Sequence, residues 1–109
     1  MTDEIIAFAF RSNEPPIAVK IPNSIDAMME FVDGRIEVVS FADGLVIVCN
    51  EEGKMRDLPA HWVAILGVRN DPIAGNFLVC RREKGVFVSI NPDDGEIAAP
   101  YIIPAAAFR

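Results

Sequence analysis

Basic residues are scarce in this chain of 109 residues, and their scarcity limits the functions open to it. Ten Lys and Arg stand against 16 Asp and Glu, which gives a formal net charge of −6. Binding along the phosphate backbone of a nucleic acid draws on clustered Lys and Arg, so this charge argues against an ordinary nucleic-acid-binding protein. The acidic excess suits a basic partner or an imitation of DNA charge, and it equally serves solubility.

Residues for metal and acid–base chemistry are also few. The chain has a single histidine, His61, and two cysteines, Cys49 and Cys80. A structural zinc site needs four ligands in closely spaced pairs, which these three residues cannot supply. Both cysteines lie inside apolar runs, where a buried reduced thiol needs no further role. We therefore predict no metal, no cofactor and no catalytic residue, and we interpret the protein as a non-enzyme.

Long apolar runs are missing as well. No run approaches the ~20 residues that a membrane-spanning helix needs. The chain begins Met1-Thr2-Asp3-Glu4, which is acidic where a secretion signal is basic. We therefore expect a cytoplasmic protein without a membrane association. Hydrophobic residues make up 51% of the chain, and its length fits a single domain over residues 1–109.

The sequence does contain a pattern of short β-strands, arranged around residues 34–53. Residues 45–49 are apolar at every position, which is typical of a strand covered on both faces, and we predict that they form the central strand. Asp43-Gly44 precedes them and supplies a hairpin turn. Further strands are predicted over residues 5–10, 17–21, 77–80 and 86–90, with a charged turn over residues 81–85.

Two helices are predicted beside these strands. The first covers about residues 24–33, where a capping Ser24 is followed by apolar residues at i, i+3, i+4 and i+7 and Gly34 ends the helix; these residues are Ile25, Met28, Met29 and Val32. Asn91-Pro92 starts a short C-terminal helix. The predicted fold class is thus α+β, with a mainly antiparallel sheet of about five or six strands.

The segment between residues 54 and 72 is harder to interpret. We expect Lys54 and Met55 to resume extended structure and residues 69–72, which read Arg-Asn-Asp-Pro, to form a turn. Residues 63–68 are apolar and short, and their periodicity fits a strand or a helical turn equally well.

Five pieces of the chain form an ordered pattern. They are Pro15-Pro16 before a strand, residues 34–39 (GRIEVV), residues 49–54 (CNEEGK), Leu58-Pro59 and residues 73–77 (IAGNF). In this order they resemble a family known only as domain of unknown function 3846, whose members are similar to small proteins of phages and conjugative elements. The resemblance implies a shared fold and a mobile-element setting, and it brings no activity, cofactor or catalytic residue. The chain departs from the family after Leu58-Pro59, where it continues Ala60-His61-Trp62.

Two polar loops and one aromatic segment supply the candidate binding residues. The loop Asn50, Glu51 and Glu52 could hold a cation or act as paired carboxylates, or it is a solvated turn. The basic residues Arg81, Arg82 and Lys84 could grip a phosphate or an acidic partner, or they form a charged hairpin tip that discourages edge pairing. His61 and Trp62 complete the set, His61 with an ordinary structural role as its alternative.

Three functions are compatible with these residues. The first is a non-catalytic accessory protein of a phage or mobile element that binds a host protein. The second is a protein that binds or sequesters an anionic metabolite or nucleotide between the basic residues and Trp62. The third is a small hydrolase that uses His61 with Cys49 or Cys80. A basic cleft that contains Trp62 would favour the second.

The C-terminal tail is almost wholly apolar. Its large residues are Ile97, Tyr101, Ile102, Ile103 and Phe108. Such a tail either folds back over its own sheet or docks on another chain, because a large apolar patch is rarely left in water. We expect the second outcome, a two-fold homodimer through the tail.

Overall fold

The computed structural model describes residues 3–12 and 14–108, apart from the side chain of Phe108. Met1 and Thr2 of the acidic start and the Phe108 side chain of the tail therefore lie outside the described residues. In chain order the elements are β1 (Glu4–Phe10), β2 (Ile17–Pro22), α1 (Ile25–Val32), β3 (Ile36–Ala42), β4 (Leu45–Asn50), β5 (Trp62–Leu66), β6 (Arg69–Ile73), β7 (Phe77–Glu83), β8 (Val86–Val88), α2 (Asp94–Ala98), β9 (Ile102–Pro104) and the 3-10 helix η1 (Ala105–Phe108). No helix in this described part is long and apolar enough to cross a membrane.

The larger sheet has six antiparallel strands, in the order β2-β1-β7-β4-β3 with β8 paired to the end of β7. β4 is an interior strand and is buried at all of its positions, as its unbroken apolar run predicts. Leu45 and Ile47 belong to the core on one face of the sheet, and Val46 and Val48 belong to the core on the other. The predicted α+β fold with a sheet of this size is confirmed.

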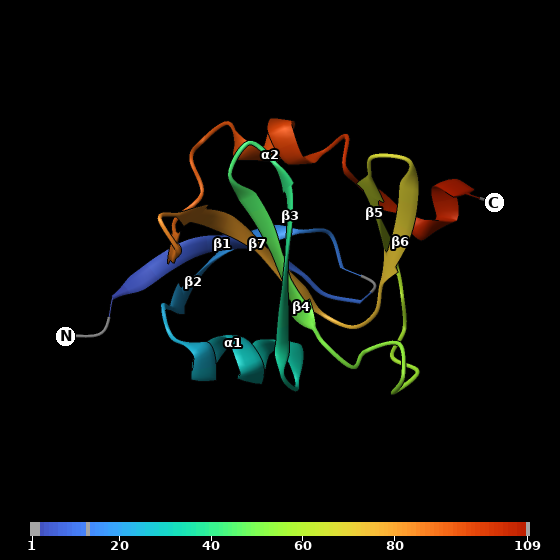
Figure 1. Ribbon diagram of the computed structural model, residues 1–109, viewed down its shortest axis with the longest axis horizontal. Helices are drawn as coiled ribbons and strands as arrows, with labels where there is room; N and C mark the ends of the chain where they lie inside the picture. Colours follow the sequence, from blue (N-terminus) through green and yellow to red (C-terminus); the bar gives the residue numbers. More distant parts are fainter. Residues whose placement is uncertain (1–2, 13, 109) are drawn as a thin grey trace.

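α1 covers one face of the larger sheet, below it in Figure 1. Ser24 caps the helix by accepting a hydrogen bond from the Ala27 amide, and Met28 and Val32 are buried against the sheet. Two details differ from the prediction. Ile25 is 52% exposed, so the buried stripe is narrower than its spacing indicates. Asp33, with φ 63°, takes the left-handed position at the end of the helix, one residue before the Gly34 that was expected to end it.

A second sheet, which the sequence analysis did not predict, covers the other face. It has three antiparallel strands in the order β6-β5-β9, and Ala64, Ile73 and Ile102 from it share one core with the larger sheet. Residues 63–68, for which a strand and a helical turn were both possible, lie mostly in the strand β5. The turn predicted over residues 69–72 is wrong, because these residues lie in β6 and the chain turns at Gly67-Val68. Pro72 fits there because β6 is an edge strand, where a missing amide hydrogen breaks no ladder.

Two further boundaries are corrected. Lys54 and Met55 are not extended, because residues 51–57 form a turn in which the Leu58 amide donates to the carbonyl of Gly53 at 3.0 Å. The charged turn over residues 81–85 is shorter than predicted, because β7 continues through Glu83 and pairs with β8. Only Lys84 and Gly85, both with positive φ, form the turn itself.

The apolar tail folds back onto its own chain. β9 pairs with β5, Ile102 is buried, and Ile97 packs against the same core. Part of the apolar surface that suggests a dimer is thus used within the chain. Dimerisation through the tail stays a prediction, with less apolar surface left to drive it.

Candidate functional site

An open apolar cleft lies where α2 meets both sheets. Its volume is about 270 Å³, and we call it the Trp62 cleft. Its walls come from three separate parts of the chain: β1 and the turn after it, the start of β5, and the segment from α2 to β9. The lining residues are Phe8, Phe10, Pro16, Trp62, Gly95, Ala98, Ala99 and Ile102. None of them carries a charge.

Aromatic packing fixes the orientation of Trp62. The Trp62 ring meets the edge of Phe10 with centroids 5.0 Å apart and the planes at 85°, and Phe10 stacks on Phe77 at 4.6 Å. Phe77 is fully buried in β7, so the row of rings is anchored in the larger sheet. Trp62 itself stays only half-buried, and it therefore presents part of its surface to the cleft.

Small residues on α2 keep the cleft open. A side chain at Gly95 would place its Cβ 3.4 Å from the ring of Phe8, an ordinary contact distance, so α2 lies close to β1 at this position. Ala98 is buried and Ala99 is exposed at the edge. Larger side chains at these two positions would fill the space in front of Trp62.

An ion pair holds α2 in place. Arg81 of β7 donates from Nε to Oδ2 of Asp94 at 2.7 Å and from Nη2 to Oδ1 at 2.8 Å. Asp94 is fully buried and also accepts from the Asn91 amide at 2.6 Å. The hydrogen bonds from Arg81 outweigh burial and hold the pKa of Asp94 below its usual value. The pKa of Arg81 is raised for the corresponding reason.

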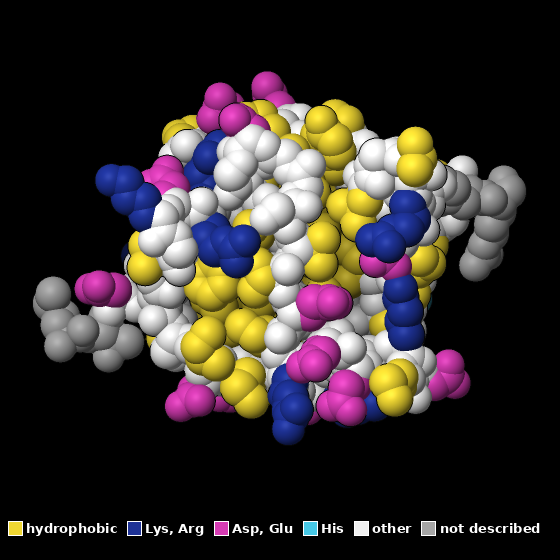
Figure 2. All heavy atoms as spheres, viewed as in Figure 1, with side chains coloured by type: hydrophobic (Ala, Val, Ile, Leu, Met, Phe, Trp, Pro, Cys, Tyr) yellow, Lys and Arg dark blue, Asp and Glu magenta, His cyan; other side chains and the backbone are white. Residues whose placement is uncertain are grey.

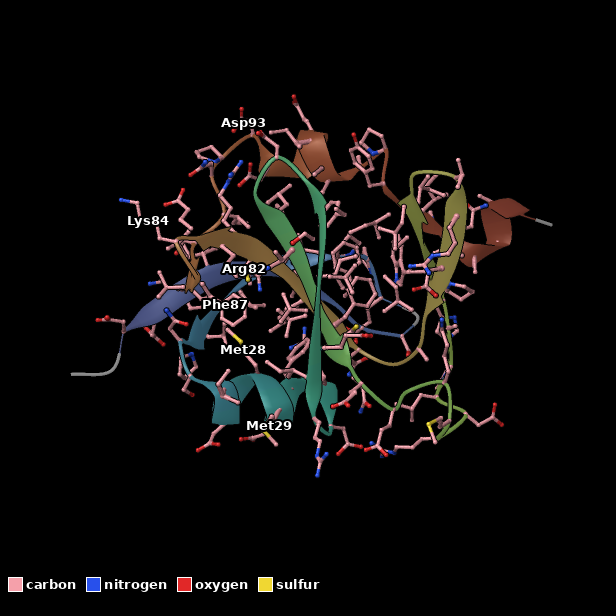
Figure 3. The ribbon with its side chains drawn as sticks, viewed as in Figure 1. Met28, Met29, Arg82, Lys84, Phe87 and Asp93 are labelled. Atoms are coloured by element: carbon pink, nitrogen blue, oxygen red, sulfur yellow. The ribbon has the colours of Figure 1, made fainter. Side chains whose placement is uncertain are left out.

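The three basic candidates are not brought together as an anion clamp. Arg81 faces α2 and its charge is taken by Asp94, whereas Arg82, the next residue along the strand, projects from the opposite face and reaches Ser40 at 3.4 Å. Lys84 lies exposed in the turn between β7 and β8 (Figure 3). None of the three lines the Trp62 cleft, so the basic cleft that would favour an anionic ligand is not formed there.

The loop of Asn50, Glu51 and Glu52 divides into one structural residue and two exposed ones. The Asn50 side chain is buried, donates to the carbonyls of Val32 and Asp33 at 2.9 and 3.1 Å, and accepts from the Glu52 amide at 2.7 Å. It therefore joins the end of α1 to the end of β4. Glu51 and Glu52 are exposed beside it.

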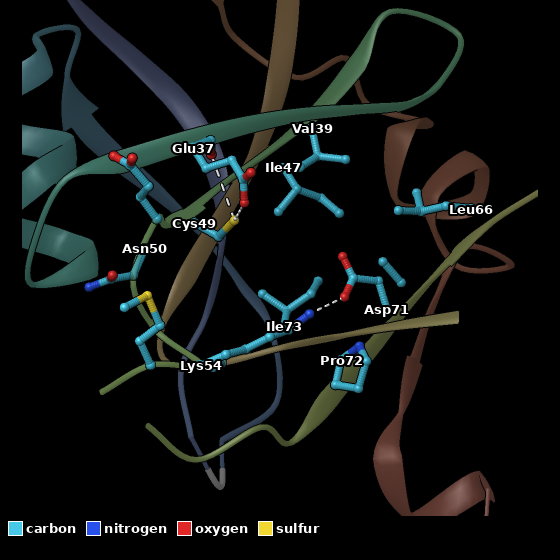
Figure 4. A pocket seen from close by; sticks show the side chains of 14 residues that line it. Glu37, Val39, Ile47, Cys49, Asn50, Lys54, Leu66, Asp71, Pro72 and Ile73 are labelled. Atoms are coloured by element: carbon cyan, nitrogen blue, oxygen red, sulfur yellow. Dashed lines mark hydrogen bonds and ion pairs between the residues drawn. The ribbon is translucent and has the colours of Figure 1, made fainter. Parts of the chain in front are cut away.

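A second, smaller cleft of about 100 Å³ separates β3 and β4 from β6 (Figure 4). Lys54 and Asp71 form an ion pair at its mouth, and the Cys49 thiol lies inside, 3.9 Å from a carboxylate oxygen of Glu37. Burial and the charge of Glu37 raise the pKa of Cys49 to about 12, and burial raises that of Cys80 to about 12. Neither thiol is therefore ionised at neutral pH, as a cysteine nucleophile must be.

His61 sits at the start of the second sheet, where its carbonyl accepts from the Ala105 amide at 2.9 Å. The thiol of Cys49 is directed to Glu37 and not to this histidine. Over residues 3–12 and 14–108 we find no cluster of His, Cys, Asp or Glu that could hold a metal ion.

Sequence reasoning singled out Trp62 and missed the other residues around the cleft. Phe8 and Phe10 were predicted only as part of a strand, and Ile102 only as part of an apolar tail. No local signal marks Gly95, Ala98 and Ala99, because small residues are common where a helix packs against a core.

Comparison with known proteins identifies a family. The model of a family described as "Domain of unknown function (DUF3846)" matches residues 5–101, nearly the whole chain. No curated protein and no solved structure matches this chain.

Proposed function

Since this chain belongs to the DUF3846 family, whose description names no activity, we propose a function from its own structure: it binds another protein by receiving an apolar side chain in the Trp62 cleft. One observation carries the proposal, namely an open, uncharged cleft with a half-buried tryptophan at its wall. Tryptophan in a pocket of this kind is typical of the residues that contribute most of the free energy of a protein–protein interface.

The size and chemistry of the cleft favour a side chain over a metabolite. Its volume of about 270 Å³ lies just under the range of about 300–1,000 Å³ typical of small-molecule sites. An anionic metabolite or nucleotide would need cations at the cleft, and Arg81 is already paired with Asp94. The hydrolase alternative has no ionised thiol to use.

The surroundings of the cleft indicate the charge of the partner. Asp93 and Glu96 lie exposed at the start of α2, where Figure 2 shows acidic side chains gathered above the sheet. Together with the net charge of −6, they favour a partner whose apolar anchor is flanked by Lys or Arg. With the family resemblance to phage and conjugative-element proteins, the proposed partner is a protein of the host cell, met in the cytoplasm.

The test uses Trp62 as its own reporter. Because the chain has a single tryptophan, its fluorescence responds to occupation of the cleft. A protein captured from host lysate and then purified should shift this emission on binding, and binding should weaken with rising salt. Ala99→Arg, at the exposed edge of the cleft, should abolish both the capture and the shift.

The matched control is Ala106→Arg, which adds the same side chain at an exposed position of η1. Both variants should keep the melting temperature of the parent. If Ala99→Arg bound the partner as well as Ala106→Arg does, the Trp62 cleft would not be the binding site.

A further inference from the structure

The face of the larger sheet that carries α1 has an apolar strip left in water. A hollow of about 290 Å³ lies between the start of α1 and the β7–β8 turn, lined by Ile25, Val86 and Phe87 among others. Ile25 and Val86 are 52% and 59% exposed, and Phe87 is half-buried. The Asn23 side chain donates to the carbonyl of Phe87 at 3.0 Å and so fixes the two walls of the hollow to each other.

The strip continues on β3, which lies beyond β7 and β4 in the sheet, and along the helix. Val38 of β3 is half-buried and packs on the same core as Phe87, and Met29 follows Ile25 one helical turn later. Figure 2 shows yellow side chains spread between α1 and a dark blue residue, which Figure 3 identifies as Arg82 lying above Phe87. We use the name apolar strip for Ile25, Met29, Val38, Val86 and Phe87.

Opposite charges border the two long sides of this strip. On the strand side stand Arg82 and Lys84, both exposed. On the helix side stand Asp26 and Glu30, which follow Ile25 and Met29 by one residue and so lie about 100° further round the helix. Among the described residues, none of these four takes part in an ion pair.

From this arrangement we infer that the apolar strip is the interface of a homodimer, in which each copy sets its basic side against the acidic side of the other. A second copy is the occupant because its surface is complementary to this one. It brings an apolar centre, acidic residues opposite Arg82 and Lys84, and basic residues opposite Asp26 and Glu30. The two-fold axis runs along the strip, since an axis across the strip would bring like charges together.

This interface is independent of the proposed partner site. The Trp62 cleft belongs to the core on the opposite face of the larger sheet, so the dimer carries two open clefts. A loss of dimerisation therefore leaves partner capture by a single copy in place, and the two proposals fail separately.

The experiment measures mass by light scattering with the full chain over a range of concentrations. The wild-type protein should have about twice the mass of the 11.9 kDa chain. The double variant Arg82→Glu/Lys84→Glu and the double variant Asp26→Lys/Glu30→Lys should each be monomeric. In each variant, side chains of the same charge would face each other across the interface and repel. Mixed in equal amounts, the two variants should form a mixed dimer.

Lys20→Glu/Arg69→Glu is the matched control, since it changes the net charge as much as the first variant does at exposed positions away from the strip. It should stay dimeric, and all variants should melt cooperatively. A wild-type monomer at every concentration would overturn the inference. So would a dimer that survives both reversals, or two reversed variants that do not combine.

Discussion

Arg81 and Asp94 join α2 to the larger sheet through two hydrogen bonds between side chains that are largely buried. The Arg81 side chain is 12% exposed and that of Asp94 is fully buried. Arg81 also donates to the carbonyl of Asp43 at 2.8 Å, so one guanidinium holds both α2 and the β3–β4 turn. The pair thereby positions one wall of the Trp62 cleft without lining it.

Replacing Asp94 should therefore destabilise the protein strongly. Asp94→Ala leaves the Arg81 charge buried without its partner, which costs about 3–5 kcal/mol of unfolding free energy. Chemical denaturation measures the loss. Asp43→Asn is the control, because the Asp43 side chain is 73% exposed and its carboxylate oxygen lies 3.7 Å from Nη2 of Arg81, too far for a hydrogen bond. Its effect on the unfolding free energy should be small. Equal losses of unfolding free energy in the two variants would show that the buried Arg81–Asp94 pair contributes no more to stability than the exposed contact.

The same pair predicts how stability changes in acid. Because the pKa of Asp94 is lowered by Arg81, the folded protein keeps this carboxylate ionised where the unfolded chain binds a proton. Its contribution is complete above the ordinary value of 3.8 and is lost as the pH falls below it. An Asp94→Asn variant should lose less stability over that pH range than the wild type. Parallel curves for the two proteins would contradict this assignment.

The larger sheet could be predicted because its signals are local. Residues 45–49 are apolar on both faces, and an interior strand is the only common element that needs such a run. The second sheet could not be predicted in this way. β6 reads Arg-Asn-Asp-Pro-Ile, which has the composition of a turn, and β9 is three residues long and pairs with residues about 40 positions earlier.

The candidate site shows the same limit. Trp62 was found because it is the one tryptophan, whereas its neighbours come from three segments that only the fold brings together. Asp94 follows the predicted helix start Asn91-Pro92, a place where an acidic residue is usually exposed. Its partner Arg81 lies on another element, so the sequence carried no sign that this charge is buried.

Both cysteines should resist alkylation in the folded state. Each is buried with a pKa raised to about 12, so the reactive thiolate is rare at mildly alkaline pH. Mass spectrometry after iodoacetamide treatment should find no label on the native protein and two labels after unfolding. The neutral thiols contribute stability that is complete below the ordinary thiol pKa of 9.0 and is lost as the pH rises above it. Rapid native labelling would place at least one thiol at the surface.

Asn50 should matter for stability, in contrast to its exposed neighbour. Asn50→Ala removes three hydrogen bonds and leaves the Val32 carbonyl without the amide it accepts from, at a cost of about 1–3 kcal/mol. Glu51→Ala is the control, because Glu51 is exposed, and it should be near neutral. Thermal or denaturant unfolding separates the two. If Glu51→Ala lost the captured partner while Asn50→Ala only lost stability, the loop would also have a binding function.

Two truncations distinguish a tail that completes the fold from a tail that only assembles copies. Removing residues 105–109 takes away η1 and leaves β9, so the chain should keep its cooperative melting. Removing residues 98–109 also takes away β9 and the buried Ile102, which lines the Trp62 cleft and belongs to the core shared by both sheets. The longer deletion should therefore expose Trp62, shift its emission to the red and abolish cooperative melting, because the second sheet loses the strand that pairs with β5. A folded species of half the parent mass after the longer deletion would instead show that the tail is an interface between copies.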